Sequence, residues 1–354
     1  MAVFISVLVV LALGCMGYLG TLFDQHNILG NIVPYAAVVI FVLGFAYRIL
    51  NWARSPVPFR IPTTGGQQKS HDWIKSNPLD NPPNAGWTVV RMALEVLAFR
   101  SLFRNTSMKL HPGPRVSYAS AKWLWLFAIL FHYCFLVIFI RHFRFFLGTS
   151  DPVLWLIDKV EFLDGIMQIG VPRLFMSGVL ILVAVGFLLG RRIFDDKVRY
   201  ISQLADYFPL MLIIGVVGTG IWMRYFGKTD ITAVKTLTMG LVTLSPVSDP
   251  VALKSVGSIF YIHLFLVCSL LIYFPFSKLM HMGGVFLSPT RNMPNDNRAK
   301  HHDNPWNPEP AFHTYAEYED DFRENMIEVG LPLDNDAPVE ATPDAPEETQ
   351  EEQV

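Results

Sequence analysis

The chain has 354 residues, of which 52% are hydrophobic and 16% are charged, and its formal net charge is −2. This is too little charge for a soluble protein of the same length, and the charge balance gives no sign of a nucleic-acid partner. The cysteines Cys15, Cys134 and Cys268 each lie in an apolar run without CxxC or CxxCH spacing. That pattern argues against covalently attached haem, iron–sulfur clusters and a disulfide framework.

Six apolar segments are long enough to cross a bilayer, because a helix needs about 20 residues to do so. They are Val3–Leu22, Ile32–Leu50, Trp123–Phe146, Pro172–Leu189, Tyr207–Phe226 and Gly257–Met280. We therefore predict an all-α integral membrane bundle. The first segment has no basic region ahead of it and no AxA-like cleavage site, so we expect a retained span and not a signal peptide.

The order of the segments predicts four regions. Residues 1–50 form a transmembrane hairpin with a short turn and a structural role, and residues 51–122 form a long loop. Residues 123–282 form a four-helix core, and residues 283–354 form a polar tail. Leu331–Val354 is rich in acid and proline, which is typical of a disordered end.

Basic residues predict the orientation. Ten Lys and Arg residues lie within residues 51–122, and four more lie within 191–206. Loops rich in Lys and Arg stay on the cytoplasmic side of a membrane. Both loops and both termini are therefore expected in the cytoplasm, and the protein in the cytoplasmic (inner) membrane of a bacterium or archaeon.

The long loop predicts a contact surface. It opens with RSPVPFRIPTTGGQQKS, a Pro- and Gly-rich stretch that suits docking to a cytoplasmic partner, although a basic anchor without a partner is the alternative. Its Gly65–Gly66 pair belongs to no nucleotide-binding motif. Arg91–Thr106 has the spaced arginines of an amphipathic helix lying at the membrane interface.

On the opposite side of the membrane, Asp151–Gly170 and Ile231–Leu244 mix apolar and polar residues at near-helical spacing. We expect both to lie flat on the membrane and to roof a pocket that opens to lipid. In the tail, the adjacent residues His301 and His302 could bind a metal ion, but we expect them to be solvent-exposed residues of the tail without a ligand.

The third and sixth spans each carry two histidines, His132 and His142 in one and His263 and His281 in the other. Histidine in a span is rarely without a function. Two imidazoles on each iron give a closed electron-transfer haem, so four histidines suit two haem b groups. The pattern predicts a di-haem cytochrome b with these residues as iron ligands.

Topology predicts the pairing, because the two helices run in opposite directions. His142 should face His263 at the outer haem, and His132 should face His281 at the inner haem. Ten residues of helix rise about 15 Å and eighteen rise about 27 Å, so a mismatch of about 12 Å must be absorbed by tilt and by a bend at Pro275. Three glycines of the fifth span permit close approach of either a helix or a porphyrin: Gly215, Gly218 and Gly220.

The histidine spacing resembles that of the gamma subunit of respiratory nitrate reductase, whereas the cytochrome bc₁ type spaces its pairs differently. Five stretches look most like the membrane cytochrome b subunits associated with dissimilatory sulfite reductase. They are RSPVPFRIPTTGGQQKS, LAFRSLFRNT, SAKWLWLFAILFHYCFLVIFIRHFRFF, RYISQLADYFPL and YIHLFLVCSLLIYFPFSKLMH. The added N-terminal helix, long loop and acidic tail depart from the nitrate reductase subunit and leave the partner open.

This resemblance implies a quinol:acceptor oxidoreductase subunit in sulfur or sulfate metabolism. Menaquinol would be oxidised near the outer haem, and electrons would pass inward to an iron–sulfur subunit resembling heterodisulfide reductase. A periplasmic cytochrome c and further membrane subunits are also implied. Candidates for contact with the quinol are Lys159, Glu161 and Asp164.

Three alternatives remain at this point. The chain could be the haem b subunit of another nitrate-reductase-like or heterodisulfide-reductase-like complex. A transporter that relays protons through histidines would need acidic partners, and none of the six predicted spans contains Asp or Glu. An anchor without a cofactor would leave the four histidines unexplained.

Overall fold

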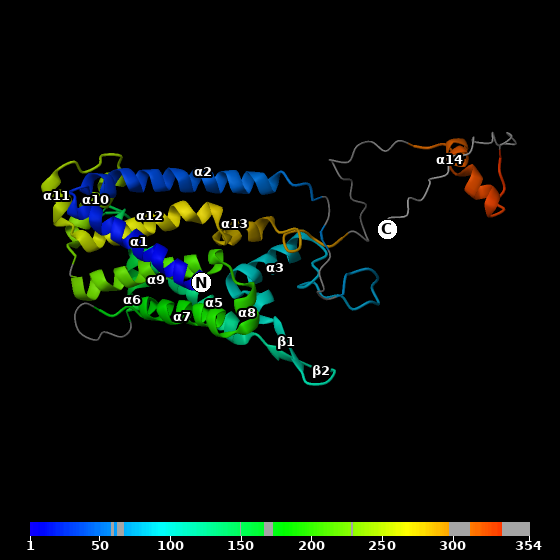
Figure 1. Cartoon of the computed structure of the whole chain (residues 1–354), viewed down its shortest axis with the longest axis horizontal. Helices are drawn as coiled ribbons and strands as arrows, with labels where there is room; N and C mark the ends of the chain where they lie inside the picture. Colours follow the sequence, from blue (N-terminus) through cyan, green and yellow to red (C-terminus); the bar gives the residue numbers. More distant parts are fainter. Residues whose placement is uncertain are drawn as a thin grey trace, which may run out of the picture. The chain divides into compact units, whose positions relative to one another are not determined.

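The computed structural model describes residues 1–57, 60–61, 67–148, 150–165, 173–227, 229–296 and 312–334. The chain divides into a unit of residues 1–302 and a unit of residues 303–354. The elements of the first unit (Figure 1) are α1 Ala2–Leu22, η1 Ile28–Ile32, α2 Val33–Ala53, α3 Ala85–Ala98, α4 Arg100–Phe103, β1 Thr106–His111, β2 Arg115–Ser120, α5 Lys122–His142, η2 Phe143–Phe145, α6 Leu154–Asp164, α7 Met176–Phe194, α8 Asp196–Ile201, α9 Leu204–Trp222, η3 Met223–Gly227, α10 Ile231–Val242, α11 Pro250–Ser255, α12 Ser258–Tyr273, η4 Phe274–Phe276, η5 Lys278–Met280, α13 His281–Gly284 and η6 Val285–Leu287.

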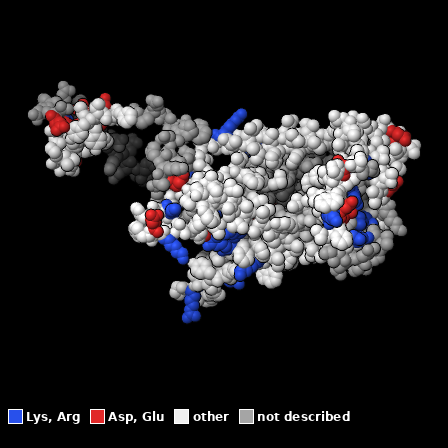
Figure 2. Space-filling view, turned by 180° about the vertical axis from the view of Figure 1, so that it is seen from behind, with Lys and Arg blue, Asp and Glu red and all other residues white. Residues whose placement is uncertain are grey.

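The predicted all-α membrane bundle is confirmed, because six helical segments are long and apolar enough to span a bilayer. They are Ala2–Leu22, Ile28–Ala53, Lys122–Phe145, Met176–Phe194, Leu204–Gly227 and Ser258–Phe276. Large apolar side chains such as Leu11 and Leu43 stay more than half exposed on these helices, as contact with lipid requires. On the face shown in Figure 2, Lys and Arg gather toward the two ends of the bundle and leave a largely uncharged belt between them.

Helix α12 lies at the centre of the packing. It contacts α1, α2 and α9, whereas α5 packs against α6 and α7 on the other side. Gly17 of α1 allows the closest of these approaches, since a Cβ there would lie 3.1 Å from the Cα of Ile262. Within the described residues, α5 and α12 are not among the helix pairs whose backbones pack extensively.

The sixth span is broken at Pro275, where a bend was predicted, so its α-helix ends before the predicted Met280. Helix α12 ends at Tyr273, a 3₁₀ turn contains Pro275, and Ser277 is extended before the next turn begins. Proline removes a backbone donor and blocks the preceding turn, which explains a break at this point. His281 therefore begins a separate short helix, α13. The direction of its side chain is not set by helical periodicity counted from His263.

The fifth span begins earlier than predicted, and its first turn contains an acidic residue. Helix α9 starts at Leu204, before the predicted Tyr207, and places Asp206 in its first turn as part of a capping box. The Asp206 carboxylate accepts from Lys278 Nζ at 2.8 Å and lies 3.7 Å from Arg192. This carboxylate is thus an ion-paired helix cap at the end of the span, and it connects the segment before His281 to α9.

The long loop folds differently from the predicted interfacial helix over Arg91–Thr106. Helix α3 begins earlier, where Asn84 caps the backbone of Trp87, and ends at Phe99, whose φ of 50° is left-handed. After the short α4, the chain forms an antiparallel hairpin of β1 and β2. Arg91 is only 7% exposed and faces Asp80, so it lies in the loop's own interior and not on a lipid-facing surface.

One buried carboxylate organises this loop. Asp80 is 4% exposed, and its carboxylate accepts from Arg100 and Arg104. Its backbone carbonyl accepts from Arg60 and Arg91. Burial opposes ionisation of Asp80, but the two arginine hydrogen bonds outweigh it and hold the pKa of Asp80 below its usual value. Four segments of the loop are thereby joined at one residue.

The second unit contains α14, Tyr315–Glu328, within the tail that was predicted to be polar. Thr314 and Glu317 form a capping box at its start, and Glu319 is fully buried beside Arg323. His301 and His302, and most of the acidic end, lie outside the described residues.

Replacing Asp80 by Asn should loosen the loop while leaving the membrane helices intact. Removing one partner of a buried ion pair costs about 3 kcal/mol, so proteases should cleave within residues 51–104 faster in the Asp80→Asn variant. Limited proteolysis of the detergent-solubilised protein measures this rate. Because the pKa of Asp80 is lowered, acid should have the same effect: the stabilisation is complete above about pH 4 and is lost as the pH falls through the folded-state pKa.

Asp72→Asn is the matched control, since Asp72 is an exposed acid of the same loop. Equal cleavage rates for the two variants would contradict the role given to Asp80.

Candidate cofactor-binding site

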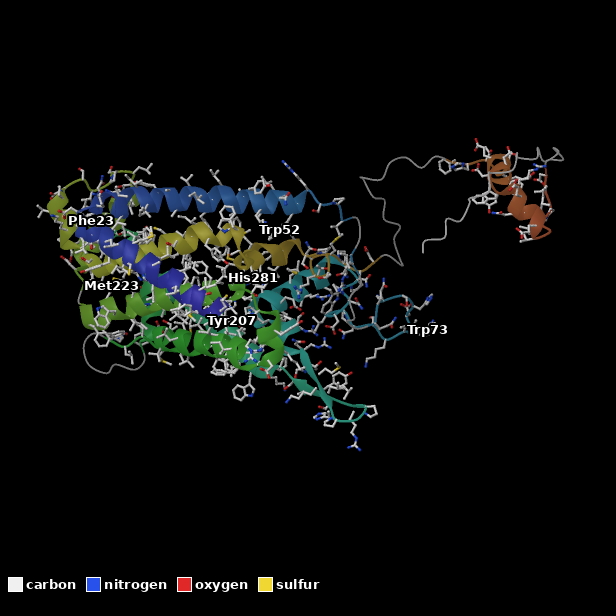
Figure 3. All side chains as sticks on the ribbon, viewed as in Figure 1. Phe23, Trp52, Trp73, Tyr207, Met223 and His281 are labelled. Carbon is white, nitrogen blue, oxygen red and sulfur yellow. The ribbon has the colours of Figure 1, made fainter. Side chains whose placement is uncertain are left out.

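The four histidines form two facing pairs. The ring centres of His142 and His263 lie 6.5 Å apart with planes at 16°, and those of His132 and His281 lie 5.9 Å apart with planes at 81°. We refer to the two ends of the bundle as the His142 end and the His132 end. His281 lies at the end from which α2 continues past Trp52 into the loop (Figure 3). The structure thus brings together the same residues that antiparallel topology predicted as partners.

Each imidazole has its Nδ1 atom occupied. His132 Nδ1 donates to the carbonyl of Ala128 at 2.7 Å, and His142 Nδ1 donates to that of Ile138 at 2.7 Å. His281 Nδ1 donates to the carbonyl of Lys278 at 2.9 Å. A carbonyl only accepts, so the proton is on Nδ1 and the Nε2 lone pair remains available to a metal.

His263 obtains the same arrangement from a neighbouring helix. Its Nδ1 lies 2.9 Å from the hydroxyl of Thr219 on α9. That hydroxyl donates to the carbonyl of Gly215 at 2.8 Å, so its lone pair accepts from the imidazole. Thr219 was not among the residues predicted from the sequence, although it is a hydroxyl residue among the glycines of an otherwise apolar span.

The glycines of the fifth span have different environments. A Cβ at Gly220 would lie 3.4 Å from His263 Cε1, and one at Gly215 would lie 3.1 Å from Val10 of α1. Gly218 has no atom within 4 Å of such a Cβ. Gly220 therefore makes room for an imidazole, and Gly215 makes room for another helix.

The spacing of both pairs fits a shared metal ion. A metal–imidazole bond is about 2 Å long, and the ring centre lies about 1 Å beyond the nitrogen, so two ligands of one ion have centres about 6 Å apart. The observed separations match this value. Two imidazoles suit an iron whose other four ligands come from a porphyrin. The described residues contain no group of three or more His, Cys, Asp or Glu side chains placed to hold a metal ion.

Aromatic side chains surround both pairs. Phe99 and Phe131 contact the edge of the His132 ring at 4.9 and 5.1 Å between centres, and Phe145 lies 6.1 Å from His142. Phe99 is the left-handed residue between α3 and α4. The loop therefore reaches one of the proposed ligands directly, a contact that the sequence did not indicate.

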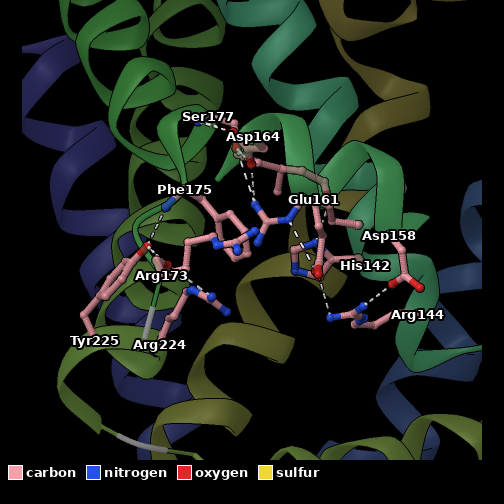
Figure 4. A network of polar contacts seen from close by, with 12 residues as sticks. His142, Arg144, Asp158, Glu161, Asp164, Arg173, Phe175, Ser177, Arg224 and Tyr225 are labelled. Atoms are coloured by element: carbon pink, nitrogen blue, oxygen red, sulfur yellow. Dashed lines mark hydrogen bonds and ion pairs between the residues drawn. The ribbon is translucent and has the colours of Figure 1, made fainter. Parts of the chain in front are cut away.

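A network of ion pairs lies beside His142 (Figure 4). Asp164 of α6 accepts from the backbone and hydroxyl of Ser177, each at 2.7 Å, and from Arg141 at 2.8 Å. Asp164 thereby caps the start of α7, whose own cap residue, Phe175, offers no side-chain acceptor. The guanidinium of Arg141 also lies 3.2 Å above the ring of Phe175.

The three predicted quinol residues are not grouped at one site. Asp164 and Glu161 are linked through Arg141, and Glu161 also pairs with Arg144 at 2.8 Å. Lys159 is exposed on α6 with its ammonium 5.9 Å from the ring of Trp155. The acceptor atoms of Asp164 are used by the protein itself.

Helices α6 and α10, which were predicted to roof a pocket, do line a cavity. Its volume is about 330 Å³, and it is lined by Arg144, Phe145, Leu154, Asp158, Ile231 and Lys235. Phe145, one of the residues that line the cavity, is the same residue that lies next to His142. Neither Lys235 nor Asp158 was identified from the sequence, although Ile231 and Lys235 are four residues apart and share a helix face.

A second cavity of about 240 Å³ lies between α7 and the end of α9. It is lined mainly by apolar residues: Leu174, Phe175, Gly178, Val179, Ile221, Tyr225 and Phe226. Among the described residues, none that lines this cavity is a carboxylate or a cation.

Residues 91–292 match the family model described as nitrate reductase gamma subunit. A protein of Archaeoglobus fulgidus named "Hdr-like menaquinol oxidoreductase cytochrome b-like subunit" is 50% identical over 284 residues, which cover 79% of this chain and 84% of the relative. A protein of the same name from Archaeoglobus profundus is 45% identical over 284 residues, covering 79% and 83%.

Asp164→Asn should lower thermal stability, because three donors at the junction of α5, α6 and α7 lose a charged acceptor. The expected cost is about 3 kcal/mol, measured as a fall in the unfolding midpoint of the purified protein. Asp158→Asn makes the same change on the same helix, at a side chain that is 66% exposed, and should have little effect. If the two variants were equally stable, Asp164 would be free for substrate after all.

Proposed function

The chain belongs to the nitrate reductase gamma subunit family, and from this premise we propose that it is a di-haem b subunit of a membrane-bound menaquinol oxidoreductase. The complex belongs to dissimilatory sulfur or sulfate metabolism. Electrons from menaquinol pass to a cytoplasmic iron–sulfur subunit resembling heterodisulfide reductase. A periplasmic cytochrome c and further membrane subunits complete it. The names of the two relatives support menaquinol as the substrate and an Hdr-like complex. The histidine pairs support the two haems.

The observation that carries the proposal is the arrangement of the four imidazoles. Both pairs have the separation of two ligands on one metal, and all four Nδ1 atoms are tied to acceptors. His142 and His263 hold one haem, and His132 and His281 hold the other. When bound, the haem iron supplies one-electron transfer between its ferric and ferrous forms.

The residues around the imidazoles prepare them for this task. The Nδ1 hydrogen bonds fix the tautomer and raise the basicity of each ligand. The flanking phenylalanines pack against His132, and the Asp206–Lys278 pair holds the segment that precedes His281.

The orientation follows from the basic loops. Residues 51–122 and α8 lie on the cytoplasmic side in this proposal, with both termini, which places the His132 end inside and the His142 end outside. The loop touches the inner ligand through Phe99, so a partner bound to it would be close to the inner haem. Residues 1–50 support the core, as their packing on α12 indicates.

The cavity between α6 and α10 is the place we propose for the quinol head group. Its apolar residues accommodate the ring, and Lys235 and Arg144 offer hydrogen bonds to an oxygen. Asp158 lines the cavity and is exposed, so we place it between the quinol and the solvent on the outer side as the group that relays protons. Of the predicted candidates, Glu161 pairs with Arg144 of the cavity wall and Asp164 pairs with Arg141, and Lys159 does not line the cavity.

Replacing either member of a histidine pair should remove the same haem. His142→Ala and His263→Ala should abolish one b-type component of the dithionite-reduced spectrum, because a haem held by one remaining bond is rarely retained. His132→Ala and His281→Ala should abolish the other. Loss of one and the same component in His142→Ala and His281→Ala would disprove the pairing.

Lys235→Leu should weaken quinol binding without loss of haem. A hydrogen bond to a charged group contributes about 1.5–3 kcal/mol, so the KM for a menaquinol analogue should rise about tenfold or more. Initial rates of haem reduction by the analogue in detergent measure it. Lys159→Leu removes a neighbouring cation outside the cavity and should leave KM unchanged. A raised KM in Lys159→Leu with an unchanged KM in Lys235→Leu would mean that the quinol does not bind beside α10.

A further inference from the structure

The hairpin of β1 and β2 carries an apolar face that nothing in the described chain covers. The register pairs Met108 with Tyr118 and Leu110 with Val116, so these four side chains share one face. They are 56%, 73%, 72% and 47% exposed, respectively. The opposite face carries Ser107, Ser117 and Ala119 together with the longer side chains Lys109, His111 and Arg115.

This hairpin gains little from the rest of the protein. Its base is closed by a bond from the Ala121 amide to the Asn105 carbonyl, and Lys197 donates to the Met108 carbonyl at 3.1 Å. A two-stranded hairpin is marginally stable in water by itself. Figure 1 shows that its strands extend away from the helices at the His132 end of the bundle. An exposed apolar face on such an element marks a contact site.

Charge indicates what the hairpin meets. No acidic residue occurs between Glu95 and Asp151, while basic residues stand before, within and after the hairpin: Arg104, Lys109, Arg115 and Lys122. A complementary surface is therefore apolar at its centre and acidic around its edge. The strands extend obliquely beyond the ends of the helices (Figure 1), and we take a protein as the owner of that complement.

We propose that residues 104–122 form the docking element for the cytoplasmic redox subunit, with the Met108, Leu110, Val116 and Tyr118 face buried in an acid-rimmed apolar groove of that subunit. This inference rests on the proposed function and names where its partner binds. The chain runs from Phe99, which contacts His132, through α4 into β1 without a break, so docking fixes the partner beside the inner pair.

The test uses the tagged full chain isolated from its native membranes in mild detergent. Haem per chain reports the bundle, and acid-labile sulfide per haem reports the iron–sulfur partner. In Leu110→Ser/Tyr118→Ser, sulfide per haem should fall about tenfold or more, as for a lost hot spot, with haem per chain unchanged. The matched control on the opposite face, Ser107→Ala/Ser117→Ala, should retain both.

Retention of sulfide in the apolar-face variant would overturn the proposal. A second variant, Lys109→Glu/Arg115→Glu, reverses charge at exposed positions away from the helices and must also release the partner; retained sulfide there would overturn it too. If the wild-type preparation itself lacked haem or sulfide, that result would contradict the proposed function. It would be distinct from the variant results, which test the docking element alone.

The membrane alternative has its own readout. A spin label on Tyr118→Cys, in vesicles of phosphatidylglycerol and phosphatidylcholine that contain the purified chain alone, should remain accessible to a water-soluble relaxation agent. A label protected from that agent and exposed to oxygen would lie in lipid, and would make the hairpin a membrane contact instead of a docking element.

Discussion

The separation between facing imidazoles is the constraint on which the membrane bundle depends. Helices α5 and α12 carry the pairs, yet each finds its extensive backbone packing elsewhere, α5 on α7 and α12 on α1, α2 and α9. Closer packing of α5 on α12 would force the paired rings together. Helices α1 and α2 thus provide packing for α12 that α5 does not.

Each end of the bundle has a buried carboxylate that joins separate segments through ion pairs. At the His132 end, Asp80 joins arginines from separate parts of the loop, and at the His142 end, Asp164 joins Arg141 to the start of α7. A buried carboxylate is costly unless several donors satisfy it, so each one favours a single arrangement of its neighbours. Irregular segments at both ends are thereby held in place relative to the rings.

The sequence was sufficient for the features that depend on composition and on spacing along one helix. The spans followed from apolar length, and the partners of His142 and His132 followed from antiparallel direction. It was not sufficient where distant contacts decide local structure. The end of α3 at Phe99, a non-glycine residue in a left-handed conformation, has no local signal. Three other features also have no local signal: the extended Ser277, the position of Asp206 inside a helix, and the hydroxyl that accepts from His263. Each depends on a neighbour from another part of the chain.

The source of each Nδ1 acceptor has a mechanical consequence. Three histidines bond to a carbonyl three or four residues earlier in their own chain segment, so their orientation is local. His263 bonds to Thr219 across the boundary between two helices. A change in the distance between α9 and α12 would therefore alter the hydrogen bond, and with it the orientation and basicity, of this one imidazole among the four.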